Sequence, residues 1–175
     1  MLSKRKFLIT ICLVIIMVFA LSACSDDKKN TPNDIKTTIN NTSEKVSITL
    51  YYPDNNASKL VAETRTVQKD KEPAKKALEE LIAGPKNTNL ISVIPKNTKV
   101  NSLNIKDGVC YVDFSKEITT ITGSTTERFV VKSIVNTLAE YDSIDKVQIL
   151  VDGKKTETLA GHVDISSPLS RSRDI

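Results

Sequence analysis

The sequence of 175 residues carries 25 lysines and arginines against 21 aspartates and glutamates, a formal net charge of +4 at pH 7. Its one histidine and its lack of a closely spaced cysteine pair argue against a zinc site, and its five glycines form no phosphate-binding loop. We therefore expect no metal and no cofactor.

The first 23 residues have the layout of a secretory signal peptide. A basic cluster at residues 4–6 precedes an uncharged apolar run over residues 7–23, which is somewhat short for a spanning helix of about 20 apolar residues. Residues 21–24, LSAC, resemble the lipobox of bacterial lipoproteins, whose cysteine receives fatty acyl chains such as palmitate. We predict a lipoprotein signal over residues 1–23 and lipidation of Cys24. A free cysteine beside an ordinary cleavage site and an uncleaved anchor are the alternatives.

Removal of this signal changes the composition of the chain. It takes away three basic and no acidic residues, which leaves 22 basic against 21 acidic side chains and a net charge of +1. A near-neutral domain without a basic stripe has no electrostatic footprint for nucleic acid. Cys12 leaves with the signal and Cys24 carries lipid, so Cys110 is the remaining thiol and no internal disulfide is expected. We expect the protein on the extracytoplasmic face of the cell membrane, held by its lipid anchor and without a nucleic-acid partner.

The mature chain is expected to hold one folded domain behind a tether. Residues 24–43, the lipidated N-terminus and a polar stretch, cannot bury enough apolar area to fold and are predicted to form a disordered tether. The domain is predicted over residues 44–171, with a short tail over residues 172–175. Hydrophobic periodicity predicts strands near residues 45–52, 60–68, 99–105, 109–114, 147–151 and 156–159, and helices near residues 73–83 and 124–141.

The connections between these elements indicate the fold class. Asp107-Gly108 predicts a tight hairpin between the third and fourth strands, and Ser124 with Glu127 has the spacing of a capping box at the start of the second helix. Cys110 alternates with apolar residues, so we expect it in the core rather than as a nucleophile. The order favours an α+β fold, with a mixed, mainly antiparallel sheet and two helices packed on one face.

Several short motifs follow one another along the predicted domain. They are Leu50-Tyr51-Tyr52, Arg65, Leu81-Ile82-Ala83-Gly84-Pro85, Ile94-Pro95, Val112-Asp113-Phe114-Ser115, Val135-Asn136-Thr137-Leu138, Val151-Asp152-Gly153, and Pro168 with Arg171. Together they resemble the GerMN domain of bacterial sporulation and spore-germination lipoproteins. The resemblance implies a fold related to the ring-building modules of secretion-type assemblies, a structural role outside the membrane and no catalytic residues. The sporulation protein carries two such domains in tandem and this chain shows one, so the resemblance leaves the partner and the assembly open.

Some polar residues are of types that can act in catalysis or bind a ligand, but structural roles are favoured for them. His162 lies in a loop two residues before Asp164, and without a second histidine it is expected to face solvent. Asp113 and Ser115 follow a strand and are expected to satisfy local backbone donors. The same preference for structure over ligand contact holds for Arg65, on a polar strand, and for the pair Asn136-Thr137, inside an apolar helix.

The function favoured by the sequence is that of a non-enzymatic, lipid-anchored interaction module in a sporulation, germination or cell-envelope assembly. Such a module would dock by a sheet edge or a helix face. Its expected partners are the membrane, through the anchor, and an extracytoplasmic envelope or sporulation-complex protein, with self-assembly as a third class. A cell-wall or small-ligand binding module serving a membrane sensor is the first alternative. An enzyme using Asp113, Ser115 or His162 is the second.

Overall fold

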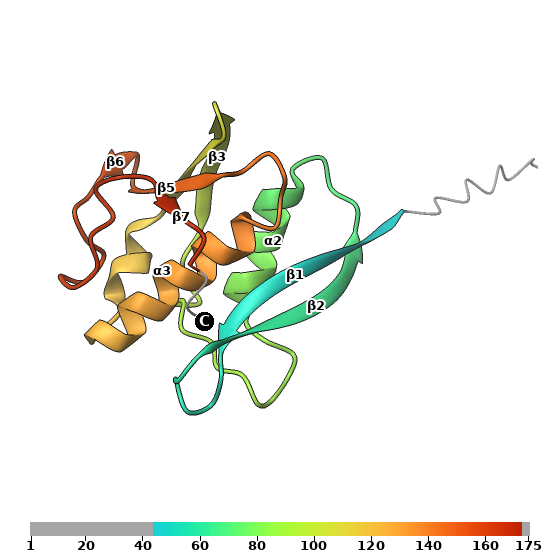
Figure 1. Ribbon diagram of the computed structural model, residues 1–175, viewed down its shortest axis with the longest axis horizontal. Helices are drawn as coiled ribbons and strands as arrows, with labels where there is room; N and C mark the ends of the chain where they lie inside the picture. Colours follow the sequence, from blue (N-terminus) through green and yellow to red (C-terminus); the bar gives the residue numbers. More distant parts are fainter. Residues whose placement is uncertain (1–43, 173–175) are drawn as a thin grey trace, which may run out of the picture. The chain divides into compact units, whose positions relative to one another are not determined.

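The computed structural model describes residues 44–172 (Figure 1), so the predicted signal peptide, Cys24 and the tether lie outside the described residues. Within the described part, no helix is long and apolar enough to cross a membrane. The elements in chain order are β1 (Lys45–Pro53), β2 (Leu60–Gln68), α2 (Pro73–Ala83), β3 (Val100–Lys106), β4 (Val109–Phe114), the short 3-10 helix η1 (Lys116–Thr120), α3 (Ser124–Leu138), β5 (Lys146–Val151), β6 (Lys154–Lys155) and β7 (Leu169–Ser170).

The strands form two sheets instead of one. Strands β1 and β2 make an antiparallel hairpin, and the larger sheet has the order β3-β4-β5-β6, with β7 also paired to β5. Only the β4–β5 pairing is parallel among the described ladders, so the arrangement is mixed and mainly antiparallel, and the predicted α+β class is confirmed. On the side of β1 away from β2, the backbone N–H of Tyr51 donates to the Thr137 hydroxyl on α3, at 3.2 Å, instead of to another strand.

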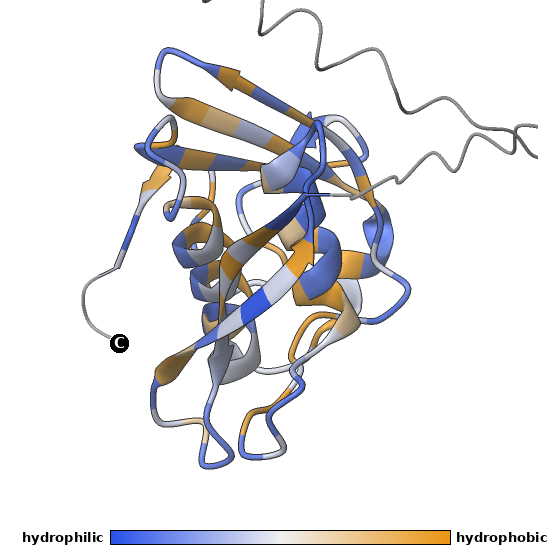
Figure 2. Ribbon diagram, turned by 90° about the vertical axis from the view of Figure 1, so that its right-hand side faces the viewer, coloured by the Kyte–Doolittle hydropathy of each residue, from blue (hydrophilic) through white to orange (hydrophobic). Residues whose placement is uncertain are grey.

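The two helices form a layer that contacts both sheets. Helix α2 packs against β1 and β3, and α3 packs against β1 and β5 (Figure 1). Bands of apolar and polar residues alternate along much of the strands (Figure 2), whereas β5 carries three apolar residues in a row, at positions 149–151. The core face of β4 and β5 is completely buried and consists of Cys110, Val112, Phe114, Val147 and Ile149.

The predicted β3–β4 hairpin is present and has a two-residue turn. Lys106 pairs with Val109, and the two turn residues between them, Asp107 and Gly108, have φ of 51° and 75°. Positive φ at both positions is the signature of a type I′ turn, which matches the twist of the flanking strands. In such a turn the closing pair is hydrogen-bonded, and hydrogen-bonded and non-hydrogen-bonded pairs then alternate along the ladder.

Two local predictions are wrong. The residue before α3 is Gly123, Ser124 is already helical, and neither forms a capping hydrogen bond through a side chain. The Glu127 carboxylate instead accepts hydrogen bonds from the backbone of a distant loop, beginning with the N–H of Leu159. Residues 156–159 form no strand, and the strand after the Asp152-Gly153 turn is the shorter β6.

Candidate functional site

Cys110 is a packing residue. Its side chain is fully buried on the core face of β4, and burial raises the pKa of the thiol to about 12. At neutral pH such a thiol is protonated, which removes the nucleophilic form. Cys110 therefore lies where the sequence predicted it and has no role at a reactive site.

Arg65 is buried, with 4% of its surface exposed, and its guanidinium is surrounded by partners. It pairs with the carboxylates of Glu63 and Glu80, and it donates to the backbone carbonyls of Glu80 and Gly84 at 3.1 and 2.9 Å. Burial alone would raise the pKa of the Glu63 carboxyl, but hydrogen bonds from Arg65 and from the backbone of Asn87 hold it below its usual value. This cluster ties β2 to the end of α2, so Arg65 has a structural role.

Asn136 and Thr137, both buried on α3, connect this helix to other parts of the chain. The Asn136 side chain accepts a hydrogen bond from the backbone N–H of Ser172 at 3.2 Å and donates to its carbonyl at 3.4 Å. The Thr137 hydroxyl accepts the Tyr51 N–H already described. The polar pair in an apolar helix therefore fixes β1 and the chain end.

In the turn that follows α3, Glu140 completes this attachment. It accepts a 2.8 Å hydrogen bond from the Tyr51 hydroxyl and forms a 2.5 Å ion pair with Arg171. The Arg171 guanidinium also lies 5.4 Å from the centroid of the Tyr51 ring and donates to the Tyr51 hydroxyl. The Arg171 of the predicted motif thus holds the C-terminal segment against β1 and α3.

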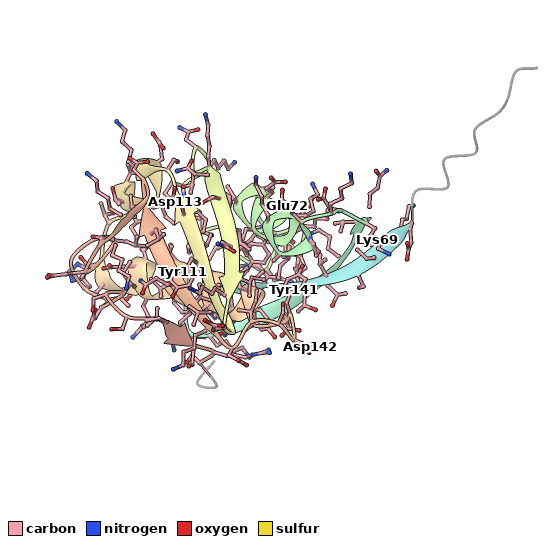
Figure 3. The ribbon with its side chains drawn as sticks, turned by 90° about the horizontal axis from the view of Figure 1, so that it is seen from above. Lys69, Glu72, Tyr111, Asp113, Tyr141 and Asp142 are labelled. Atoms are coloured by element: carbon pink, nitrogen blue, oxygen red, sulfur yellow. The ribbon has the colours of Figure 1, made fainter. Side chains whose placement is uncertain are left out.

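Asp113 lies near the end of β4 (Figure 3), and Ser115 follows that strand directly. The Asp113 carboxylate accepts hydrogen bonds from the Gly153 N–H at 2.7 Å and from the Asn101 side-chain amide at 3.1 Å. The Ser115 hydroxyl accepts from the Lys99 N–H at 3.0 Å, and the Lys99 carbonyl accepts the Ser115 N–H at 3.0 Å. Both residues bind local donors and hold the start of β3, the end of β4 and the β5–β6 turn together.

His162 is exposed in a loop, as predicted. Its backbone N–H donates to Glu127 at 2.8 Å, and Asp164 accepts from the Ser166 N–H at 2.9 Å instead of orienting the imidazole. Among residues 44–172, no group of three or more histidines, cysteines or carboxylates is placed to hold a metal ion. Of the three residues proposed for an enzyme, Asp113 and Ser115 lie together at the end of β4, whereas His162 lies in the loop after β6. Within the described residues, no hydrogen bond joins His162 to either of the other two side chains.

An open polar hollow of about 810 Å³ lies at the end of the sheet that Asp113 and Ser115 organise. Three exposed lysines line it, Lys96 and Lys99 before β3 and Lys116 in η1, and none of the three forms an ion pair within the described part of the chain. Thr98, also in the lining, is 5% exposed, and its buried hydroxyl lacks a hydrogen-bond partner in the structure as described. The hollow can therefore receive a negatively charged group.

Two carboxylates share this hollow with the three lysines. Glu117 and Asp152 complete the charged lining. A hydrogen bond from the Ser115 hydroxyl and one from its own backbone N–H lower the pKa of Glu117, with smaller contributions from the nearby lysine charges. Glu117 is thus already engaged by local donors, and the charged groups left to face solvent are mainly ammonium groups.

Strand β3, which rises from this hollow, is an open sheet edge. It pairs with β4 on one side, and between 44 and 172 nothing hydrogen-bonds to its other side. The opposite edge of the same sheet is covered, because β6 and β7 both pair with β5. The edges of the small sheet are also less open. On β1, the Tyr51 N–H donates to the Thr137 hydroxyl of α3. On β2, the Glu63 carboxylate accepts the N–H groups of Lys86 and Asn87 at 3.0 and 2.9 Å.

The lysine-lined hollow was not predicted from the sequence, although its signal is present there. Residues 96–106, KNTKVNSLNIK, contain three lysines and no acidic residue. Three lysines without an acidic residue, in a segment that includes an edge strand, favour a surface for an acidic partner. The periodicity of residues 99–105 predicted a strand but could not say that this strand would end the sheet.

Comparisons with known proteins add to this geometry. The family model described as Germane, sporulation and spore germination, matches residues 49–157. Over 132 residues the chain is 34% identical to the spore germination protein GerM of Bacillus subtilis (strain 168), and the match covers 72% of this chain and 36% of that protein. The chain thus spans about a third of the length of this relative.

Solved structures give the same fold. The first GerMN domain of the B. subtilis sporulation protein GerM aligns with a TM-score of 0.65 and 36% identity, over 72% of this chain and 98% of that one. The tandem GerMN domains of that protein align with 0.65 and 33%, over 73% of this chain and 46% of theirs. A Clostridium perfringens crystal structure, provisionally described as a lipoprotein, aligns with 0.54 and 27%, over 81% of this chain and 93% of that one. These likenesses confirm the resemblance to the GerMN domain.

Proposed function

The chain belongs to the Germane family of sporulation and spore germination proteins, and from this membership we propose that it is a non-enzymatic, lipid-anchored interaction module on the extracytoplasmic face of the membrane. It would hold a protein of a sporulation, germination or cell-envelope assembly near the membrane. The names of its relatives refer to sporulation and germination rather than to an enzymatic reaction.

The anchor in this proposal is Cys24. Its support is the sequence LSAC after an uncharged apolar run, together with the description of the C. perfringens structure as a lipoprotein. A single acyl chain binds membranes only marginally, so stable attachment would use two or more chains on this residue. Residues 25–43 would then join the lipidated residue to the folded part.

The docking site in this proposal is the open edge of β3, and this asymmetry of the larger sheet is the observation that carries it. Natural proteins cover or shorten exposed edges because unpaired N–H and C=O groups recruit other strands. Here β6 and β7 cover one edge, whereas β3 presents its outer side along residues 103–106. An added strand from a partner would satisfy these groups.

A pair of proline variants tests this docking site. Ile105 belongs to a non-hydrogen-bonded pair with Cys110, so its N–H points away from β4, whereas Asn104 forms a hydrogen-bonded pair with Tyr111. Ile105→Pro should therefore remove an outward donor and leave the β3–β4 ladder intact, because proline is tolerated where an edge N–H faces outward. Asn104→Pro should break the ladder and destabilise the fold.

The measurement is the size of the native complex after extraction of membranes in mild detergent. We expect the unaltered protein in a larger complex, and Ile105→Pro at the membrane, folded, but released from that complex. A complex that keeps its size with Ile105→Pro, confirmed to be folded by circular dichroism, would contradict docking at β3. The lysine-lined hollow favours the second candidate function, binding of a cell-wall fragment, which predicts a raised melting temperature with such fragments even for Ile105→Pro.

A further inference from the structure

We infer that the segment bound at the β3 edge is an extended stretch of a partner protein with acidic side chains at both ends, one of which enters the lysine-lined hollow. The inference rests on the proposed docking at β3 and names the chemistry of the partner. It follows from the backbone of β3, from one exposed apolar side chain and from the distribution of charge along residues 96–106.

The backbone determines that the partner is a strand. Leu103 and Ile105 each belong to a non-hydrogen-bonded pair of the β3–β4 ladder, which turns their N–H and C=O groups outward. These alternate groups are the ones that an added strand pairs with, whereas a helix, whose own N–H and C=O groups are already hydrogen-bonded, would leave them unpaired. Beyond them, the register shifts at Asn101, where a bulge ends the regular edge.

An exposed apolar side chain lies near the C-terminal end of the edge. Ile105 is 39% exposed and is the one large hydrophobic residue classed as exposed among residues 44–172. Its neighbour two positions earlier, Leu103, is partly buried against the core. A partner strand would cover Ile105 with an apolar residue of its own, since cross-strand neighbours on one face lie within contact distance.

The lysines at the two ends of β3 favour acidic residues at the two ends of the partner strand. Lys99 precedes β3 and Lys106 ends it, and both side chains are exposed. Residues that lie seven positions apart in an extended chain are separated by roughly 23 Å, so acidic residues six to eight positions apart in the partner could meet both. Lys96 and Lys116 reinforce the Lys99 end, where the hollow is wide enough for a carboxylate side chain.

The same charges argue against a second copy of this chain as the occupant. Pairing of two β3 edges would bring together two segments that each carry Lys96, Lys99 and Lys106 and no acidic residue. Like charges across an interface oppose association. The covered edge of another copy offers no acidic alternative either, because β6 consists of Lys154 and Lys155.

Hydrogen exchange on the full chain in detergent micelles tests the inference. The probe is an acetylated nine-residue peptide of alternating threonine and valine with two glutamates at each end, and its matched control has lysine in place of every glutamate. We expect the acidic peptide to slow exchange over residues 102–106 by about tenfold or more, because an added strand closes the outward amides. The lysine peptide should leave the exchange unchanged.

Charge-reversal variants separate the outcomes further. Lys99→Glu with Lys106→Glu should abolish the protection by the acidic peptide and create protection by the lysine peptide. The control double variant, Lys45→Glu with Lys71→Glu, makes the same change of charge at exposed sites outside β3 and should behave like the unaltered protein.

Three results would overturn the inference in distinguishable ways. Equal protection by both peptides would leave docking at β3 standing and remove the acidic preference. Protection by neither peptide would contradict the proposed docking site as well. Binding of a polyphosphate chain that changes exchange near Thr98 and Ser115, without any peptide protecting residues 102–106, would assign the hollow to an anionic polymer instead.

Discussion

The fully buried carboxylate of Glu127 accepts a 2.9 Å hydrogen bond from the backbone N–H of Leu159, which lies in the loop after β6. The same carboxylate accepts from Ala160 at 2.9 Å and from His162 at 2.8 Å. Three N–H groups of one irregular loop are thus satisfied by a single side chain from the first turn of α3. The Glu127 carboxylate therefore fixes the position of this loop.

Replacement of Glu127 should therefore destabilise the protein strongly. Glu127→Ala leaves three N–H groups without their acceptor, and each buried, unsatisfied donor costs about 1–3 kcal/mol. We expect a loss of about 3 kcal/mol or more in the free energy of unfolding, and a smaller loss for Glu127→Gln, which keeps one acceptor oxygen. Urea denaturation measures both values, and a loss below about 1 kcal/mol for Glu127→Ala would contradict this account.

The same residue should make stability depend on pH. Burial alone would raise the pKa of Glu127, but the hydrogen bonds from Ala160, His162 and Leu159 hold it below its usual value. A carboxyl with a lowered folded-state pKa contributes stability that is complete above its unfolded pKa, about 4.3, and is lost as the pH falls through the folded pKa. Between about pH 5 and pH 3, Glu127→Gln should lose stability less steeply than the unaltered protein. Parallel slopes would contradict the assignment.

The Arg65 cluster should be far more important to stability than an exposed ion pair of the same hairpin. Removal of one partner from a buried pair costs about 3–5 kcal/mol, because the remaining charges stay buried. We expect Arg65→Met to lose about that much in urea denaturation. The matched control is Lys69→Ala, whose exposed 2.8 Å pair with Glu44 should contribute less than about 1 kcal/mol. Similar losses for both variants would mean that the buried cluster is dispensable.

Cys110 should be inert in the folded protein and reactive in the unfolded one. Its thiol is fully buried with a pKa raised to about 12. A disulfide reagent at pH 8 should leave this thiol unmodified in the native mature protein and modify it in denaturant. Rapid modification of the native protein would show that the β4 core face opens readily.

Cys24 is predicted to be the residue that holds the protein at the membrane. Cys24→Ala should leave the folded part intact and remove membrane attachment, and mass spectrometry should find acyl chains on the N-terminal peptide of the unaltered protein. Cys12→Ala, a cysteine change inside the apolar run, is the matched control and should stay attached. Attachment of the Cys24→Ala protein that survives carbonate washing would point to an uncleaved anchor.

Local patterns in the sequence predicted most of the elements, and long-range contacts decided the rest. Alternation identified β1 and β2, and Asp107-Gly108 identified the β3–β4 turn, because these signals are contained in a few neighbouring residues. The division into two sheets depends on which element meets the edge of β1. That partner is Thr137 on α3, and no local pattern contains this pairing.

The site shows the same limit. Structural roles for Arg65, Asp113 and Asn136 were predicted from their residue types, but their partners lie in other elements and emerged only with the fold. The sequence pattern assigned Glu127 to a local capping box. In the structure its carboxylate oxygens instead accept N–H groups of a loop far along the chain. The lysines of residues 96–106 were visible in the sequence, but only the sheet order shows that they flank an open edge.

Photo-crosslinking in living cells tests most directly whether a partner protein docks at the β3 edge. A photoreactive amino acid would replace Ile105 on β3 in one strain and the exposed Thr64 on β2 in another. We predict one discrete adduct from position 105, absent from position 64 and lost when Lys99→Glu and Lys106→Glu are added, with the crosslinked partner peptide extended and acidic. Equal adducts from both positions, or an adduct unaffected by the charge reversal, would contradict docking at this edge.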